Sequence, residues 1–286
     1  MNYFKQILRF AIPYKTYAFL NVLANIFEKP YSLILHEFDE NYEPHSFEGS
    51  GDVKYHRGFT ADILTSNHEK MHLLIPANPS HLESVNCVAE GQTYAKQEKH
   101  NDKGKVLCVE IHGDASESGQ GVIYEGMQLG NLEGYGTGGR IHIIMDNEIG
   151  FTTLPQDSRS TRYPTAIALA FEAPVFHLNA EDPEGCVKAC RLAIDIRQKF
   201  GCDVFLHLCG YRKYGHNEGD EPSYTQPLQY QIIRNKKSIR EIYRDFLIEK
   251  GEIEENLAQQ AEKEFQDKLQ NALEGAKEFL VKEPAP

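Results

Sequence analysis

The chain has 286 residues, of which 41% are apolar types and 25% are charged. This composition allows one large domain or two small ones around a sizeable core. The formal net charge of −12 argues against a nucleic-acid partner, because binding a phosphate backbone calls for a basic face. We therefore expect an ordinary soluble globular protein.

The N-terminal region contains one uncharged stretch, TYAFLNVLANIF, at residues 16–27. It is too short for a membrane-spanning helix, and no small-residue cleavage site follows it cleanly. We predict a core helix here, with a targeting segment as the alternative. No membrane partner is expected.

Short apolar runs and helical patterns alternate along the middle of the chain. We predict strands at residues 71–76, 106–112, 141–146, 173–178 and 203–208, and helices at 82–99, 121–132 and 184–200. Near-continuous apolar strands separated by helices are typical of a mainly parallel sheet that is covered on both sides. The predicted fold class is therefore α/β, with a mainly parallel sheet and helices on both faces.

The pattern changes to charged helices after Pro227. We predict one helix at residues 229–249 and another at 253–281, the second apolar on one face and acidic elsewhere. We therefore divide the chain into an α/β domain at residues 1–250 and a helical C-terminal connector at 251–286.

The six cysteines contain no C-x-x-C pair. Two of them, Cys108 and Cys209, lie in apolar strand-like runs. This usage favours buried, reduced thiols over a zinc site, because the spacing typical of zinc ligands is missing.

Polar residues follow two of the predicted strands directly, where parallel sheets bind their ligands. Gly113 and Asp114 follow the first, ahead of a helix whose N-terminus offers N–H groups to an anion. Asn147 and Ile149 follow the second. A carboxylate, an amide oxygen and a nearby backbone carbonyl suit Mg²⁺ that bridges phosphate oxygens. The alternative is that Asp114 caps a helix and Asn147 serves a turn.

Three histidines, His56, His81 and His216, lie in polar loops that contain Gly or Pro, which favours a functional role. Four others alternate within predicted strands, where a structural role is the better interpretation. These are His112, His142, His177 and His207.

Several segments together resemble one enzyme family. They include GSGDVKYHRGF, ANPSHLESVN, IHGDASESGQGVIYE, GYGTGGRIHIIMDNEIGFTT, SRSTRYPT, APVFHLNAEDPE and GYRKYGHNEGDEPSYTQP. In this order they resemble the decarboxylating component of thiamine-diphosphate-dependent 2-oxoglutarate dehydrogenases. The resemblance extends from about residue 20 to the C-terminal helices, and implies the diphosphate-binding domain of that fold for residues 1–250.

The resemblance also implies roles for individual residues. Asp114, Asn147 and the carbonyl of Ile149 would bind Mg²⁺, while Ala115 and Ser116 would contact the diphosphate of thiamine diphosphate through backbone or hydroxyl groups.

The loop histidines take their implied roles from the same family. His56 and His81 would face the substrate, and His216 would lie on the cofactor side. The implied reaction is oxidative decarboxylation of 2-oxoglutarate with transfer of the succinyl group to a lipoyl-bearing succinyltransferase component. The implied location is the bacterial cytoplasm or the mitochondrial matrix.

Three departures bear on activity. Thr-Tyr-Ala-Phe at residues 16–19 replaces the family's His-Arg-Gly-Arg before LNVLAN, which removes basic groups that would anchor phosphate or substrate. The family's pyrimidine-binding domain, which supplies the activating glutamate, has no counterpart here, so we expect a partial or split subunit. A homodimer or a partner chain would then complete the site. Glu117 adds negative charge beside the expected diphosphate site. The alternatives are a noncatalytic truncated remnant or assembly module, and the same chemistry on 2-oxoadipate.

Overall fold

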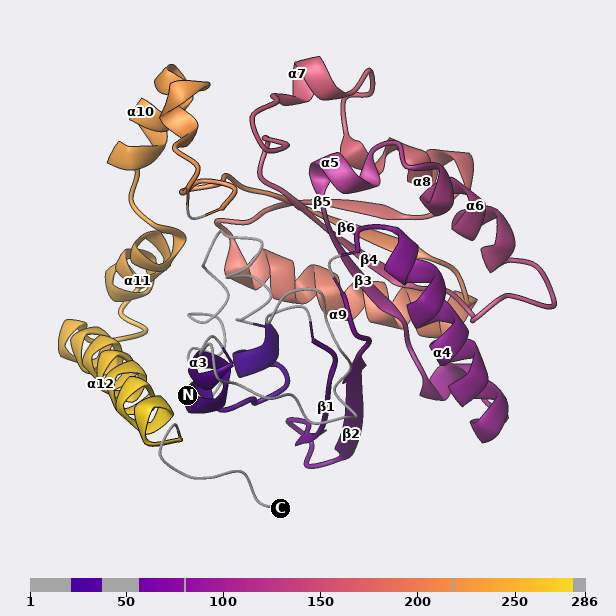
Figure 1. Cartoon of the computed structure of the whole chain (residues 1–286), viewed down its shortest axis with the longest axis horizontal. Helices are drawn as coiled ribbons and strands as arrows, with labels where there is room; N and C mark the ends of the chain where they lie inside the picture. Colours follow the sequence, from indigo (N-terminus) through magenta and orange to yellow (C-terminus); the bar gives the residue numbers. More distant parts are fainter. Residues whose placement is uncertain (1–21, 38–56, 80, 218, 280–286) are drawn as a thin grey trace. The chain divides into compact units, whose positions relative to one another are not determined.

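The computed structural model describes residues 22–37, 57–79, 81–217 and 219–279 (Figure 1). They belong to two compact units, one formed by Met1–Pro79 with Lys237–Pro286 and the other by Ser80–Lys236. Residues 16–21 of the predicted core helix lie outside the described part, and residues 22–25 are helical. The expected boundary at residue 250 does not coincide with the limits of these units, and the connector it defines stays a prediction.

The first unit contains a β-hairpin made of β1 (Phe59–Leu64) and β2 (Lys70–Ile75). The predicted strand at 71–76 exists, but its expected place in the parallel sheet is wrong. Its partner β1 is antiparallel, because the short loop closed by the Thr65 N–H to Glu69 carbonyl bond reverses the chain. β1 was not predicted, because polar residues alternate with apolar ones along it and no continuous apolar run marks it.

Helices complete this unit: α3 (Tyr31–His36), α11 (Ile239–Glu249) and α12 (Glu255–Phe279), with α12 packed along α3. The single helix predicted at 229–249 is wrong, because Lys236 is extended and ends α10 (Pro227–Asn235). Ser238 and Glu241 then form a capping box that starts α11. Within the described residues, no helix has the length and apolar character to cross a membrane.

The second unit is built on four parallel strands in the order β3 (Val109–Gly113), β4 (Ile141–Asp146), β6 (Val204–Cys209) and β5 (Val175–Asn179). This confirms the predicted α/β class. The longer helices are α4 (Ser84–His100), α6 (Gly121–Gly130) and α9 (Pro183–Phe200). The short ones are η3 (Lys103–Lys105), α5 (Asp114–Glu117), α7 (Pro155–Ser158), η4 (Pro164–Ala166), α8 (Ile167–Ala170) and η5 (Pro222–Tyr224).

Helices cover both faces of this sheet, as predicted. On one face, α6 and α8 pack on Ile144 and Phe205. On the opposite face, Ala189 and Ala193 of α9 pack on Ile141. Because strand side chains alternate between the faces, the even-numbered residues of β4 point toward α6 and the odd-numbered ones toward α9.

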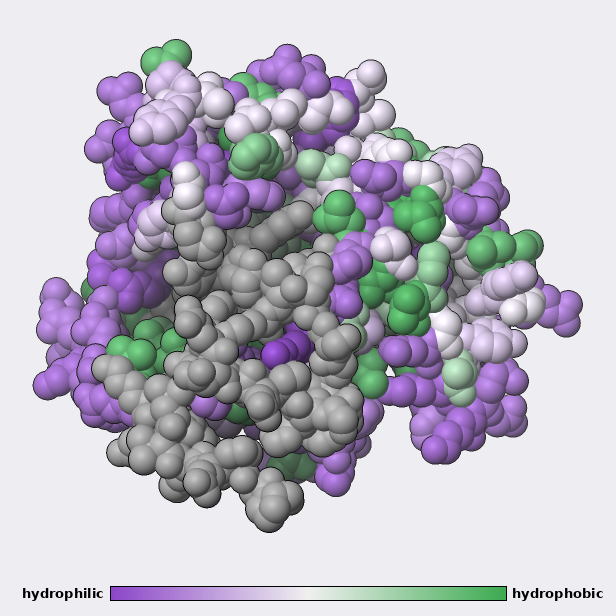
Figure 2. All heavy atoms as spheres, viewed as in Figure 1, coloured by the Kyte–Doolittle hydropathy of each residue, from purple (hydrophilic) through white to green (hydrophobic). Residues whose placement is uncertain are grey.

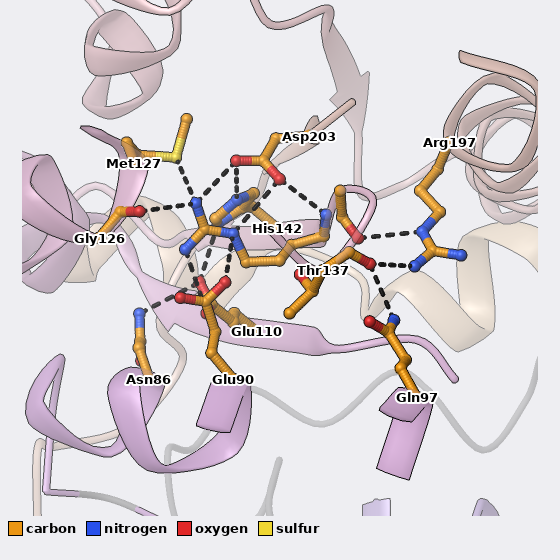
Figure 3. A network of polar contacts seen from close by, with 12 residues as sticks. Asn86, Glu90, Gln97, Glu110, Gly126, Met127, Thr137, His142, Arg197 and Asp203 are labelled. Carbon is orange, nitrogen blue, oxygen red and sulfur yellow. Dashed lines mark hydrogen bonds and ion pairs between the residues drawn. The ribbon is translucent and has the colours of Figure 1, made fainter. Parts of the chain in front are cut away.

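A buried polar network ties α4, β3 and β4 together on the α6 side (Figure 3). Arg140, which is 3% exposed, lies 2.8 Å from Asp203 and 3.0 Å from Glu90 of α4. His142 lies 3.0 Å from Glu110. Burial alone would lower the pKa of His142, but Glu110 and Asp203 raise it to about 9. The buried charges therefore compensate one another and fix the strands in register.

The loop before β4 is held from both faces of the sheet. Arg197 of α9 donates to the carbonyls of Gly139 and Thr137, each at 2.9 Å. Gln97 of α4 donates to the same Thr137 carbonyl at 2.8 Å. Gly139 itself has φ +89°, and a Cβ there would lie 2.2 Å from the Cys202 carbonyl oxygen. Only glycine fits this position.

We expect Gly139→Ala to lower the free energy of unfolding by about 2–5 kcal/mol, because it adds backbone strain and a steric clash. The matched control is Gly91→Ala in α4, where an added Cβ meets no atom within 4 Å. That change should be neutral or stabilising by up to about 1 kcal/mol, since alanine favours helix. Urea unfolding followed by circular dichroism measures both, and equal midpoints for the two variants would contradict the packing described for Gly139.

Candidate functional site

The carboxyl ends of β3 and β4 bring two buried carboxylates together. Gly113 and Met145 are register partners, so Asp114 and Asp146 lie at the same edge of the sheet. They are 3% and 4% exposed. Two adjacent buried carboxylates require a compensating cation.

Arg159, which follows α7, supplies that positive charge. Its guanidinium lies 3.0 Å from Asp114 Oδ2 and 3.5 Å from Asp146 Oδ2. Burial and the charge of Asp146 still raise the pKa of Asp114 above its ordinary value. Burial also disfavours the Asp146 carboxylate, but hydrogen bonds from His207 and the Glu148 N–H leave its pKa below the ordinary value. The two acids thus differ, and Asp114 is the more weakly compensated.

The loop after β4 is anchored against its surroundings. Ile149 is 3% exposed and packs with Tyr230 and Ile233 of α10. Asn147 is half-buried, and its Oδ1 accepts the Ile149 N–H at 3.3 Å. A Cβ on Gly150 would lie 2.8 Å from the Cβ of Ala115, so this loop touches α5 directly. The predicted residues after β3 and β4 therefore form one continuous surface.

The two residues expected to contact a diphosphate differ in exposure. Ala115 is exposed, whereas Ser116 is buried and its hydroxyl donates to the Gly113 carbonyl at 3.0 Å. The Ser116 hydroxyl already has an acceptor within the protein. A ligand would therefore meet the Ala115 backbone more readily than the Ser116 hydroxyl.

The three loop histidines have separate positions. His216 is exposed, and its ring meets the Phe151 ring edge-to-face at 5.0 Å, beside the loop after β4. His81 is exposed just before α4, where its carbonyl accepts the Ser84 hydroxyl at 2.6 Å. His56 lies outside the described residues. The structure thus brings His216 to the Ile149 loop, while roles for His56 and His81 stay predictions.

Glu117 is buried inside the second unit, whereas we expected its negative charge to lie beside the diphosphate site. It is 0% exposed, its carboxylate lies 3.8 Å from His112 Nε2, and burial raises its pKa to about 7. Among the described residues, neither Glu117 oxygen has a hydrogen-bond partner. Its charge is therefore partly suppressed at neutral pH and directed into the interior of the unit.

Asp146 ends a predicted strand but was not predicted as a site residue, and Arg159 was not predicted at all; the two strand histidines, His177 and His207, are hydrogen-bonded beside Asp146. His207 Nε2 lies 2.8 Å from Asp146 Oδ2, and His177 Nδ1 lies 2.7 Å from His207 Nδ1. The available signal was that His177 and His207 lie within neighbouring predicted strands of the parallel sheet, where they become register partners. Arg159 carried no local pattern, because its partners come from two other segments.

We expect Arg159→Met to lower the free energy of unfolding by about 3–5 kcal/mol near neutral pH, since it leaves the buried Asp114 carboxylate without its ion-pair partner, while Asp146 keeps its hydrogen bonds from His207 and the Glu148 N–H. A carboxyl whose folded pKa is raised contributes stability at low pH that is lost as the pH rises through that pKa. The raised pKa of Asp114 should rise further in this variant. The deficit should therefore shrink as the pH falls toward the ordinary aspartate value.

Urea unfolding at several pH values tests this expectation. Arg162→Met is the matched control, because Arg162 is exposed and stacks on Tyr163. It should change stability by about 0.5 kcal/mol or less. A pH-independent deficit in Arg159→Met would contradict the electrostatic role of this residue.

Known proteins are similar in sequence to this chain over most of its length. A family model described as "Dehydrogenase E1 component" matches residues 27–285. The "Multifunctional 2-oxoglutarate metabolism enzyme" of Mycolicibacterium vanbaalenii is 46% identical over 274 residues, which are 93% of this chain and 22% of that protein. The "2-oxoglutarate dehydrogenase, mitochondrial" of Dictyostelium discoideum is 48% identical over 235 residues, 80% of this chain and 23% of that protein.

The chain therefore spans about a fifth of the length of the curated relatives it matches. The match over residues 27–285 confirms the resemblance inferred from the sequence motifs. This chain therefore belongs to the dehydrogenase E1 component family.

Proposed function

We propose that this chain forms the diphosphate- and magnesium-binding portion of a thiamine-diphosphate-dependent enzyme that oxidatively decarboxylates 2-oxoglutarate. The observation that carries the proposal is the pair of buried carboxylates, Asp114 and Asp146, at neighbouring strand ends. The family match and the names of the two relatives support the same reaction class.

The residues at this edge fit a magnesium ion by their chemistry. Asp114 offers a carboxylate with a raised pKa, Asn147 an amide oxygen and Ile149 a backbone carbonyl. These are hard oxygen donors of the kind that Mg²⁺ binds, with phosphate oxygens completing the shell. Arg159 now supplies the positive charge that a divalent ion would replace.

Each of these residues would then have a defined task. Asp114, Asn147 and Ile149 would hold Mg²⁺, and the exposed Ala115 backbone would meet the diphosphate. Arg159, released from Asp114, would offer its guanidinium to phosphate oxygens. When bound, thiamine diphosphate supplies the electron sink for decarboxylation, while the protein orients it and stabilises charge.

The loop histidines would serve the substrate. His56 and His81 would assist proton movements and hold the 2-oxoglutarate carboxylates near neutral pH, and His216 would act from the cofactor side. The product would be a succinyl group passed to a lipoyl-bearing succinyltransferase component. The same chemistry on 2-oxoadipate is the nearest alternative, because substrate choice rests on few pocket contacts.

The complete site would include a surface contributed by a homodimer or by a partner chain. Figure 2 shows apolar residues interspersed on a largely hydrophilic face. In the second unit, Leu228 and Ile232 lie one helical turn apart on α10 and are 77% and 70% exposed. Such exposed apolar residues support a docking role. A bacterial cytoplasmic or mitochondrial location would fit the relatives.

A noncatalytic role is the second candidate, and one observation favours it. The Asp114–Arg159 ion pair, with its 3.0 Å separation, already satisfies the carboxylate on which metal binding depends. Mg²⁺ dehydrates reluctantly and would have to displace this buried guanidinium. A protein in which the pair persists would act as an assembly module rather than as an enzyme.

Titration calorimetry of thiamine diphosphate in the presence of Mg²⁺ tests the proposal. We expect binding that depends on Mg²⁺ and that falls at least tenfold in Asp114→Asn and in Asn147→Ala, because each removes one metal ligand. Asp195→Asn, on the exposed side of α9, is the matched control and should bind like the original chain. Absence of binding by folded protein, with and without added pyrimidine-binding partner, would favour the noncatalytic role.

A further inference from the structure

A second cluster of metal-binding side chains lies at the carboxyl ends of β4 and β6. Asp146 and Cys209 are register partners, and His207 lies two residues before Cys209 on the same face of the sheet. The Asp146 oxygen, a His207 ring nitrogen and the Cys209 sulfur all lie within 4.8 Å of one another. Asp146 and His207 are buried, at 4% and 1% exposure.

The distances suit one small ion. His207 Nε2 lies 2.8 Å from Asp146 Oδ2 and 3.6 Å from Cys209 Sγ. Two ligand atoms at roughly 2.0–2.1 Å from a tetrahedral ion lie about 3.3 Å apart. The Asp146–His207 separation is about half an ångström shorter than this, and the Cys209 sulfur lies 3.7 Å from Nδ1 as well as 3.6 Å from Nε2, so the sulfur must swing toward Nε2 for the three donors to share an ion.

A fourth residue is placed to orient the imidazole. His177 of β5 is the register partner of His207, and the two Nδ1 atoms are 2.7 Å apart. If His207 Nε2 binds a cation, its Nδ1 carries the proton and donates it to His177. Metal-bound histidines almost always make such a second hydrogen bond, which fixes the tautomer and the ring.

The donor set selects the class of metal. Carboxylate, imidazole and thiolate together suit zinc-like divalent ions, whereas Mg²⁺ and Ca²⁺ prefer oxygen donors. A thiolate ligand favours metals with a high affinity for sulfur. Arg159, 3.5 Å from Asp146 Oδ2, is a positive charge that opposes the binding of a cation at this carboxylate.

We propose that Asp146, His207 and Cys209 form a binding site for a zinc-like divalent transition metal, with His177 as the positioning residue. Three protein ligands leave the fourth coordination position open for water or an anionic ligand. The site is distinct in its donors from the proposed Mg²⁺ site. Cysteine spacing along the chain could not predict it, because its ligands come from two strands that the fold makes neighbours.

Cobalt(II) is the direct probe, because a thiolate ligand gives a charge-transfer band and four-coordinate geometry gives strong visible bands. We expect the full chain to bind one equivalent of Co²⁺ with both signals and to lose them when Zn²⁺ is added. A large excess of Mg²⁺ should leave them unchanged. This last result separates the site from the proposed Mg²⁺ site, so failure of either proposal leaves the other standing.

The variants identify the ligands. Cys209→Ser should abolish the charge-transfer band, and His177→Gln should weaken Co²⁺ binding about 10–100-fold with the band retained. Cys202→Ser is the matched control, since Cys202 is another half-buried cysteine, near the opposite end of β6, and it should change nothing. The exposed His177 keeps the test valid if Cys209→Ser fails to fold. A band that persists in Cys209→Ser, equal affinity in His177→Gln, or no Co²⁺ binding by the folded chain would overturn the proposal.

Discussion

The candidate site depends on one electrostatic constraint: two buried carboxylates at adjacent ends of parallel strands must share a cation. Asp114 and Asp146 are held there by β3 and β4, and Arg159 supplies the charge at 3.0 and 3.5 Å. Since burial makes an uncompensated carboxylate costly, this edge of the sheet needs a cation wherever both carboxyl groups are ionised. A bound divalent ion and an internal guanidinium are two ways of meeting the same requirement.

The rest of the unit gives this edge its rigidity. Arg197 and Gln97 both donate to the Thr137 carbonyl and so hold the loop before β4 from opposite faces of the sheet. Arg140 and Asp203 add a buried ion pair at 2.8 Å on the α6 side. These contacts fix where β4 starts, and the parallel register with β3 then fixes where it ends. Sites on rigid strand ends are held more accurately than sites on free loops.

Much of this fold could be predicted from sequence, because strands buried on both faces are near-continuous apolar runs. The four strands of the parallel sheet are such apolar runs, although Val109 and Ile111 of β3 stay exposed on one face. Two predicted elements were wrong, because local hydrogen bonds redirected the chain against the apolar pattern of its sequence. The Thr65–Glu69 turn made the strand at 71–76 half of a hairpin, and the Ser238 capping box divided one predicted helix in two. In the site, Asp114 and Asn147 could be predicted from their positions after strands. Arg159 could not, because its partners are distant in sequence.

Our central proposal is that a divalent metal and a diphosphate displace the Arg159 guanidinium from Asp114 at this edge. A crystal structure of the chain grown with Mn²⁺ and thiamine diphosphate tests it most directly, since Mn²⁺ reports its position by anomalous scattering. The account predicts one manganese peak bounded by Asp114, Asn147 and the Ile149 carbonyl, with Arg159 moved from Asp114 to the diphosphate. An Arg159–Asp114 pair unchanged beside a metal-free edge would contradict it.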